Sequence, residues 1–149
     1  MAVNPDFVGR TYPPSGPYAV DAALISAFAG AVGSHDPVHT DAEAARAAGY
    51  PDVVAPPTMA VRLSQQSERA YITDPEAGID FSRVVHGEQR FVHHRPIAAG
   101  DEVLAQTTVD AVRSAGGHSM VTTRTELTTT SGEALTTSTS TIVVRGGEE

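Results

Sequence analysis

The sequence contains no cysteine and no lysine, and these two absences exclude several kinds of chemistry. Without cysteine, the chain forms no disulfide and offers no thiolate nucleophile. All ten basic residues are arginine, so no side chain can form a Schiff base with a carbonyl substrate. No apolar run approaches the roughly eighteen residues of a membrane span. The opening segment "MAVNPDFVGR" lacks the charged-then-apolar order of a secretory signal, and we expect a cytoplasmic protein.

Positive charge is also scarce, and the formal net charge is −8. No basic stripe is visible, so we expect neither a nucleic acid nor a membrane as a partner. Scattered arginines could still bind a single phosphate or carboxylate. The 149 residues fit one domain, and we find no repeat and no linker. We expect the folded core to cover about residues 8–144, followed by a loose tail, "GGEE", at residues 146–149.

The first half of the chain has helical patterns. Asp21 is a candidate N-cap for a helix that ends at Gly33, and its apolar residues recur at helical spacing. A second helix is expected over 40–49, with Thr40 or Asp41 as its cap and Glu43 completing a capping box. A third is expected to begin near Pro57 and to end near residue 71, since proline is tolerated in a first turn.

The second half has the composition of strands. Residues 83–95 are extended and mostly alternating, and runs rich in valine and threonine cover residues 101–114, 118–129 and 133–145, with glycine-containing turns between them. Tyr18 marks a further short strand. We interpret the threonine-rich positions as exposed strand faces. Helices followed by an antiparallel meander predict an α+β domain with helices on one face of a sheet.

The stretch "AVGSHDPVHTD" concentrates titratable residues in a loop between the first two helices. His35, Asp36 and His39 lie there within five positions. An imidazole beside a carboxylate is suited to proton transfer near neutral pH. A metal site is less well supported, because no third ligand cluster accompanies the histidines. Alternatively, Asp36 and the following proline only form a turn, and His39 has a structural role, as a helix cap or as a packed side chain.

Two other segments could contribute to a site. A helix that starts near Pro57 would present the free N–H groups of Thr58 and Met59, which could stabilise an oxyanion; an ordinary proline-capped helix is the alternative. In the strand "HGEQRF", strict alternation puts His86 and Gln89 on opposite faces. Alternation also separates the adjacent histidines of "VHHR", so that pair is poorly placed to chelate a metal.

Together, "GSHDPVHTDAEAARAAGYPDVVAPPTM" and "VVHGEQRFVHHRPIAAGDEV" resemble the MaoC-type (R)-hydroxyacyl dehydratase and enoyl hydratase family. The resemblance is strongest to the actinobacterial heterodimeric hydroxyacyl-carrier-protein dehydratase subunits, and it extends from about Val8 to Val144. It implies a hot-dog fold, in which an antiparallel sheet wraps around a central helix. In the heterodimeric relatives, one subunit keeps the catalytic dyad and the other chiefly shapes the acyl channel.

The family's motif, roughly G-D-x-N-P-(aliphatic)-H, is only partly kept. Gly33, the proline and valine before the histidine, and His39 itself all match. Ser34 replaces the motif's aspartate, and Asp36 replaces its asparagine. Pro57 stands where catalytic relatives tend to have a glycine whose N–H polarises the thioester. The resemblance therefore carries His39 over as the catalytic residue, with Asp36 as a displaced partner. The candidate substrate-binding residues are Ser34, Pro57, Thr58, Met59, His86 and Gln89.

The resulting hypothesis is a dehydratase or hydratase acting on 3-hydroxyacyl or 2-enoyl thioesters, without metal or other cofactor. Its partners would be acyl-CoA or an acyl carrier protein, and a second MaoC-like subunit in a homodimer or heterodimer. An alternative is a non-catalytic subunit that binds the acyl chain, favoured by Ser34 and Pro57. A hot-dog thioesterase is less well supported, because the matched motif belongs to hydration.

Overall fold

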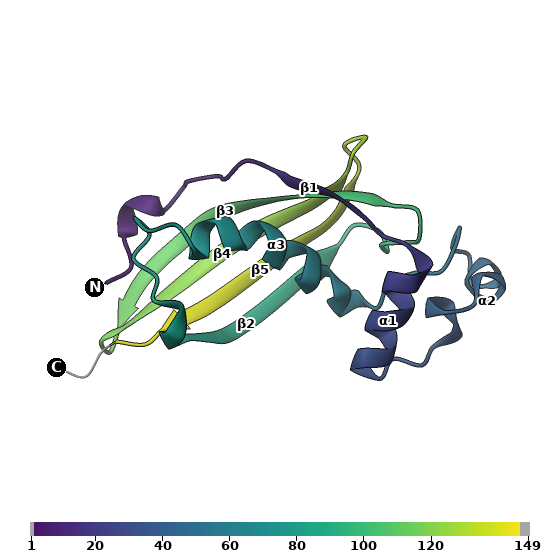
Figure 1. Cartoon of the computed structure of the whole chain (residues 1–149), viewed down its shortest axis with the longest axis horizontal. Coiled ribbons are helices and arrows are strands. Elements are labelled where there is room, and N and C mark those ends of the chain that lie inside the picture. The colour runs from purple at the N-terminus through teal and green to yellow at the C-terminus, as the bar shows by residue number, and fades with distance from the viewer. Residues whose placement is uncertain (1, 147–149) are drawn as a thin grey trace.

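A five-stranded antiparallel sheet forms the body of the protein in the computed structural model, which describes residues 2–146 (Figure 1). The strands follow the order β1-β3-β4-β5-β2, which places β2 at one edge. Their bounds are β1 Ser15–Ala19, β2 Val84–His93, β3 Glu102–Ala115, β4 His118–Thr129 and β5 Ala134–Val144. The expected α+β architecture is therefore confirmed. Of the predicted tail, only Gly146 falls within the described residues.

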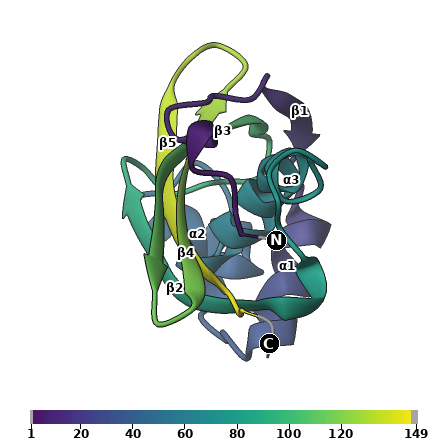
Figure 2. The ribbon, with the colours of Figure 1, turned by 90° about the vertical axis from the view of Figure 1, so that its left-hand side faces the viewer.

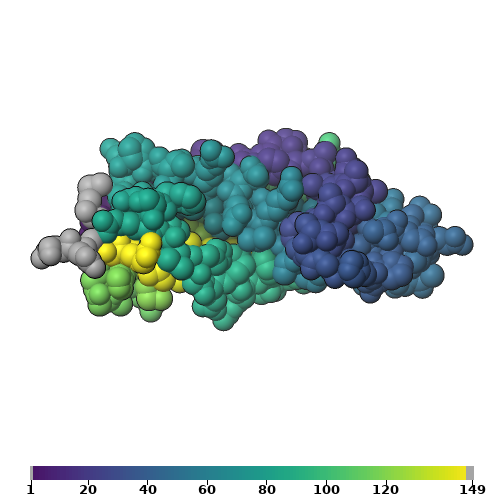
Figure 3. All heavy atoms as spheres, turned by 60° about the horizontal axis from the view of Figure 1, so that its bottom comes forward, coloured from purple at the N-terminus to yellow at the C-terminus, as the bar shows by residue number. Residues whose placement is uncertain are grey.

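The helices lie on one face and at one end of this sheet (Figures 1 and 2). The long helix α3 runs along the concave face, and the chain from α1 to α2 forms one end of the molecule (Figure 3). Within the described part of the chain, no helix is long and apolar enough to cross a bilayer. The helices are α1 Ala22–Val32, α2 Ala42–Ala47 and α3 Ala60–Ile72, and the 3-10 turns are η1 Pro5–Phe7, η2 Pro37–His39, η3 Pro57–Met59 and η4 Phe81–Arg83.

The predicted helix ends are correct to within a few residues. The Asp21 side chain accepts a hydrogen bond from the Leu24 N–H at 2.7 Å, and Gly33 ends α1 at a φ of 71°. In α2 the cap is Asp41, which accepts from the Glu43 N–H, so the expected capping box through Thr40 is wrong. The third helix begins with the turn η3 rather than an α-helical turn at Pro57. Pro56 and Pro57 supply no N–H to the first turn.

The inner face of the sheet holds buried hydroxyl groups as well as apolar side chains. The interpretation of the threonine-rich positions as exposed faces is wrong for alternate positions of β3, β4 and β5, where threonine and serine side chains are buried in the interior. Hydrogen bonds compensate for part of this burial; one joins the Thr107 and Thr125 hydroxyls at 2.8 Å. The buried hydroxyl residues of β3, β4 and β5 are Thr107, Ser119, Thr123, Thr125, Thr129, Thr136, Ser138 and Ser140.

A β-bulge at Gly87 changes which side chains of β2 share a face. His86 pairs with Ile142 of β5, and Gln89 pairs with Ser140, while the register shifts between them. Ile142 and Ser140 are both buried on the inner face, so His86 and Gln89 also lie on that face. The prediction from strict alternation is wrong here, because the bulge inserts one extra residue into β2.

Glu68 of α3 is a buried carboxyl, and it makes a test of stability possible. Burial raises the pKa of the Glu68 carboxyl, while a hydrogen bond with Thr123 acts in the opposite direction. The folded state therefore holds a proton that the unfolded chain releases, and stability falls as pH rises above the unfolded pKa. We expect the variant Glu68→Gln to be more stable than the parent at pH 7, and the difference to shrink at pH 4.

Urea unfolding of both proteins at the two pH values measures this difference. Glu88→Gln, at an exposed position of β2, is the matched control and should change stability little at either pH. A Glu68→Gln variant that is less stable than the parent at pH 7 would show that the carboxyl is charged and satisfied in the folded protein.

Candidate active site

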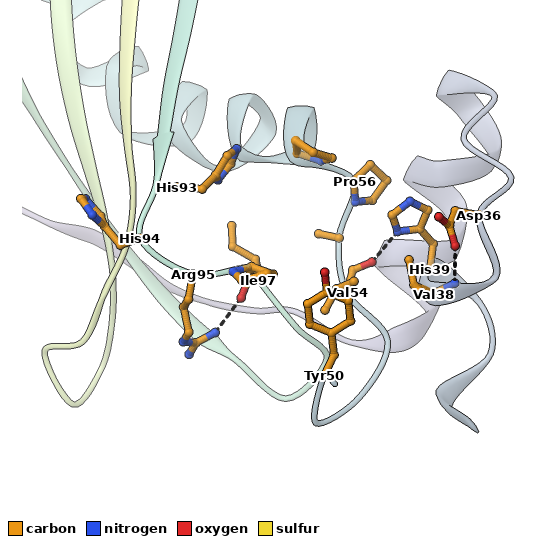
Figure 4. A pocket seen from close by; sticks show the side chains of 13 residues that line it. Asp36, Val38, His39, Tyr50, Val54, Pro56, His93, His94, Arg95 and Ile97 are labelled. Atoms are coloured by element: carbon orange, nitrogen blue, oxygen red, sulfur yellow. Dashed lines mark hydrogen bonds between the residues drawn. The ribbon is translucent and has the colours of Figure 1, made fainter. Parts of the chain in front are cut away.

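A cavity of about 490 Å³ lies where the N-terminal end of the central helix meets the end of β2 (Figure 4). Three segments form its walls: the η2 loop, the segment that leads into η3, and the chain that leaves β2. Its lining residues are Asp36, Val38, His39, Tyr50, Val54, Ala55, Pro56, Pro57, His93, His94, Arg95, Pro96 and Ile97.

His39 is held in one orientation on the wall of this cavity. Its side chain is buried, and its Nδ1 lies 2.6 Å from the carbonyl oxygen of Val54 (Figure 4). Because a carbonyl can only accept, Nδ1 carries the hydrogen in this contact. The neutral imidazole then has an unprotonated Nε2, which is the form of a general base. The Val54 N–H donates to the carbonyl of Val38 at 3.0 Å and ties the two segments together.

Asp36 lies in the same cavity but is engaged differently. Its exposed carboxylate accepts a hydrogen bond from the Val38 N–H at 3.0 Å and thereby caps η2 (Figure 4). Within residues 2–146 it makes no hydrogen bond with His39. Asp36 therefore shapes the turn, as in the alternative that gives it no catalytic role. The Val54 carbonyl, and not the Asp36 carboxylate, orients the imidazole of His39.

The other predicted site residues are dispersed. Pro57 lines the cavity with Asp36 and His39, whereas Ser34, Thr58, Met59, His86 and Gln89 do not. The Ser34 N–H donates to the carbonyl of Ala29 at the end of α1. The Met59 N–H donates to the carbonyl of Pro56, while the exposed Thr58 N–H has no hydrogen-bond partner in the described chain.

The structure adds His93 to the cavity lining, a residue for which the sequence predicts no role in the site. Its Nδ1 lies 3.0 Å from the hydroxyl oxygen of Thr136. Burial lowers the pKa of His93, although the carbonyl of Pro57 beside it acts in the opposite direction. Its neighbour His94 contacts Thr137, on the other face of β5, so the two histidines diverge as predicted. The described residues contain no group of three His, Asp or Glu side chains placed to hold a metal.

An ion pair fixes the chain that leaves β2. Both terminal nitrogens of Arg95 donate to the carboxylate of Asp101 at 2.8 Å, and the Ala98 N–H donates to the same carboxylate at 2.8 Å. Burial alone would raise the pKa of Asp101, but these hydrogen bonds hold it below its usual value. A bidentate pair of this kind restricts the orientation of both side chains. The cavity therefore has one wall that is rigidly held.

The sheet, its central helix and the histidine-containing loop define a hot-dog domain of the dehydratase type. The chain belongs to the family of the FAS1-like dehydratase domain region, whose model matches residues 6–138. The resemblance to MaoC-type dehydratases, first seen in the sequence, is confirmed at the level of the family.

Three comparisons illustrate the relationship. A "UPF0336 protein" of Saccharopolyspora erythraea is 48% identical over 149 residues, which is 100% of this chain and 96% of that one. The HadBC complex of Mycobacterium tuberculosis, a (3R)-hydroxyacyl-ACP dehydratase, contains a chain with 30% identity and a TM-score of 0.82, covering 93% of this chain and 97% of that chain. A "MaoC-like dehydratase" has 31% identity and a TM-score of 0.88; the similarity covers 95% of this chain but 43% of that larger one.

Proposed function

We propose that this protein is a hydro-lyase that interconverts (R)-3-hydroxyacyl and 2-enoyl thioesters. The observation that carries the proposal is the hydrogen bond from His39 Nδ1 to the Val54 carbonyl. It fixes the tautomer of a buried histidine on the wall of a cavity, in a chain of the dehydratase family. Coenzyme A or an acyl carrier protein would supply the pantetheine arm of the substrate.

In the hydration direction, His39 Nε2 accepts a proton from water as the water oxygen bonds to C3 of the enoyl thioester. Electron density moves to the thioester oxygen, and a proton then returns to C2. Dehydration is the reverse. The Val54 carbonyl takes the orienting role that was expected of Asp36. The Asp36 carboxylate would share the proton on His39 Nε2 only through a bridging water. Since the Met59 N–H is already engaged, the proposed donor to the thioester oxygen is the N–H of Thr58, which follows the cavity-lining Pro57.

Hydration of trans-2-butenoyl-CoA by the purified chain tests this proposal directly. Loss of the ultraviolet absorbance of the enoyl thioester measures turnover, and chiral analysis of the product identifies the (R)-alcohol. We expect turnover without added metal or nucleotide. Absence of turnover by the chain alone, with any partner omitted, would contradict a self-sufficient enzyme.

The second candidate is a non-catalytic subunit that binds the acyl chain beside a catalytic partner. Ser34 at the family's aspartate position, and the use of Asp36 as a cap, favour it. The larger MaoC-like dehydratase, of which this chain matches less than half, also favours a second unit. Turnover that needs a partner with the intact motif, and that persists in the variant His39→Ala, would select this candidate.

Either candidate is compatible with a dimer formed at the edge of the sheet. In the described chain, β2 pairs with β5 on one side only, so ten residues of backbone are open to a partner strand. We propose that a second hot-dog domain covers this edge, in a homodimer or a heterodimer. Light scattering should then give twice the 15.5 kDa of the single chain for a homodimer, or the sum of the two subunit masses for a heterodimer.

A further inference from the structure

A band of polar side chains crosses the interior of the protein, between the sheet and α3. In the register of the sheet, the inner-face positions of β3, β4, β5 and β2 form transverse rows. One row runs from Thr107 to Phe91, and the next runs from Val109 to Gln89. Serine, threonine or glutamine occupies most positions of these two rows. We call the following residues the polar belt: Thr107, Thr125, Ser138, Thr123, Ser140 and Gln89 of the sheet, with Ser64, Ser67 and Glu68 of α3.

The polar belt separates two apolar clusters. The first contains Met59, Leu63 and Leu135 and lies at the end of α3 that borders the His39 cavity. The second contains Tyr71, Val121 and Ile142 and lies at the other end. A continuous apolar interior would accept an alkyl chain along its whole length, whereas this interior changes to hydroxyl and amide groups at its middle.

The inner face of β2 runs from the His39 cavity to the belt, and this is the path that an acyl chain would follow. His93 lines that cavity, and His86 lines a second cavity of about 700 Å³ beside Glu68 and Ile142. Between the two histidines, the inward-facing side chains of β2 are Phe91 and Gln89. Strand geometry places Gln89 roughly 13 Å beyond His93. An acyl chain whose thioester sits near Pro57 would extend in this direction.

A hydrogen-bonded bridge closes the path. The side-chain amide of Gln89 donates to the Ser138 hydroxyl at 2.7 Å, and Ser138 and Ser64 share a hydrogen bond at 3.1 Å. The Ser64 hydroxyl donates in turn to the Ala60 carbonyl at 2.8 Å. The bridge therefore runs from the edge strand to the central helix. Beside it, Gln89 Oε1 and the hydroxyls of Ser67 and Ser140 are buried without a partner in the described chain.

We propose that the bridge of Gln89, Ser138 and Ser64 sets the length of the acyl chain that this protein accepts. A butanoyl chain ends before the bridge. A dodecanoyl chain reaches the bridge. It must then either break the hydrogen bonds of the bridge or cover the neighbouring polar atoms that lack a partner, and each of these costs binding free energy. The protein thus selects short acyl chains. This inference rests on the proposed function in so far as a thioester occupies the His39 cavity.

Calorimetric titration with butanoyl-pantetheine and dodecanoyl-pantetheine tests the bridge, because this arm is common to coenzyme A and carrier protein. We expect the parent protein to prefer the butanoyl thioester. In Gln89→Leu the preference should shift toward the dodecanoyl thioester by about tenfold or more. Gln66→Leu is the matched control, because it makes the same replacement at an exposed position of α3, away from the bridge. It should leave the preference unchanged. Ser64→Ala removes the link from Ser138 to α3 without adding bulk, and serves as the second variant if Gln89→Leu folds poorly.

The outcomes separate this inference from the proposed function. If the parent binds both thioesters equally, or if neither variant moves the preference, the bridge does not limit chain length. If the parent and both variants bind neither thioester, the cavity is not an acyl-thioester site, and the proposed function itself is wrong. Because binding is measured, the result holds for a self-sufficient enzyme and for a non-catalytic subunit.

Discussion

Replacing His39 with alanine is expected to lower kcat for hydration of trans-2-butenoyl-CoA by about 10²–10⁴-fold, the usual contribution of a positioned general base. The imidazole has no substitute in the cavity. His93 and His94 also line it, but both are exposed, and their ring nitrogens contact the hydroxyls of Thr136 and Thr137. Alanine also removes the hydrogen bond to Val54, so the loop must be shown to stay folded before the loss is assigned to chemistry.

Two further variants make the interpretation specific. Asp36→Asn keeps an N-cap acceptor for the Val38 N–H but removes the charge. Because Asp36 makes no hydrogen bond with His39 in the described chain, we expect a smaller loss than in His39→Ala. His35→Ala changes an exposed histidine outside the cavity lining and should retain activity. Activity that survives His39→Ala in the chain alone would exclude His39 as the base.

Most of the fold could be predicted from the sequence, because burial imposes a period on each element. Leucine, isoleucine and phenylalanine at helical spacing located α1. The alternating run located β2, and the valine- and threonine-rich runs located β3, β4 and β5. The caps Asp21 and Asp41 accept the hydrogen bonds that such residues are suited to accept. Each of these signals arises from residues that are close together in the sequence, so it can be recognised without the tertiary structure.

The parts that sequence reasoning missed depend on contacts between distant residues. The bulge at Gly87 is visible only in the pairing of β2 with β5, and it brings His86 and Gln89 to one face. The tautomer of His39 depends on Val54, fifteen residues away. Whether a threonine faces water or the interior depends on register, so composition alone could not reveal the polar belt. The role of Asp36 as the cap of η2 likewise depends on the loop geometry.

Met59 provides a test of the start of the central helix, where a backbone role and a side-chain role can be separated. Its side chain is fully buried in the first apolar cluster, while its N–H donates to the Pro56 carbonyl. We expect Met59→Ala to lower the free energy of unfolding by about 2–5 kcal/mol, the usual cost of a large-to-alanine change in a packed core. Urea unfolding, monitored by circular dichroism, measures this cost.

Met120→Ala is the matched control, since Met120 is 39% exposed. Its effect should stay within about 0.5 kcal/mol. The backbone N–H of residue 59 is unchanged by either substitution, so kcat measured at a temperature where Met59→Ala remains folded should stay close to that of the parent. An unaltered stability combined with a large loss of activity would place the Met59 side chain in contact with substrate. The cavity would then extend past Pro57 into the first apolar cluster, and the path toward the polar belt would begin at α3 itself.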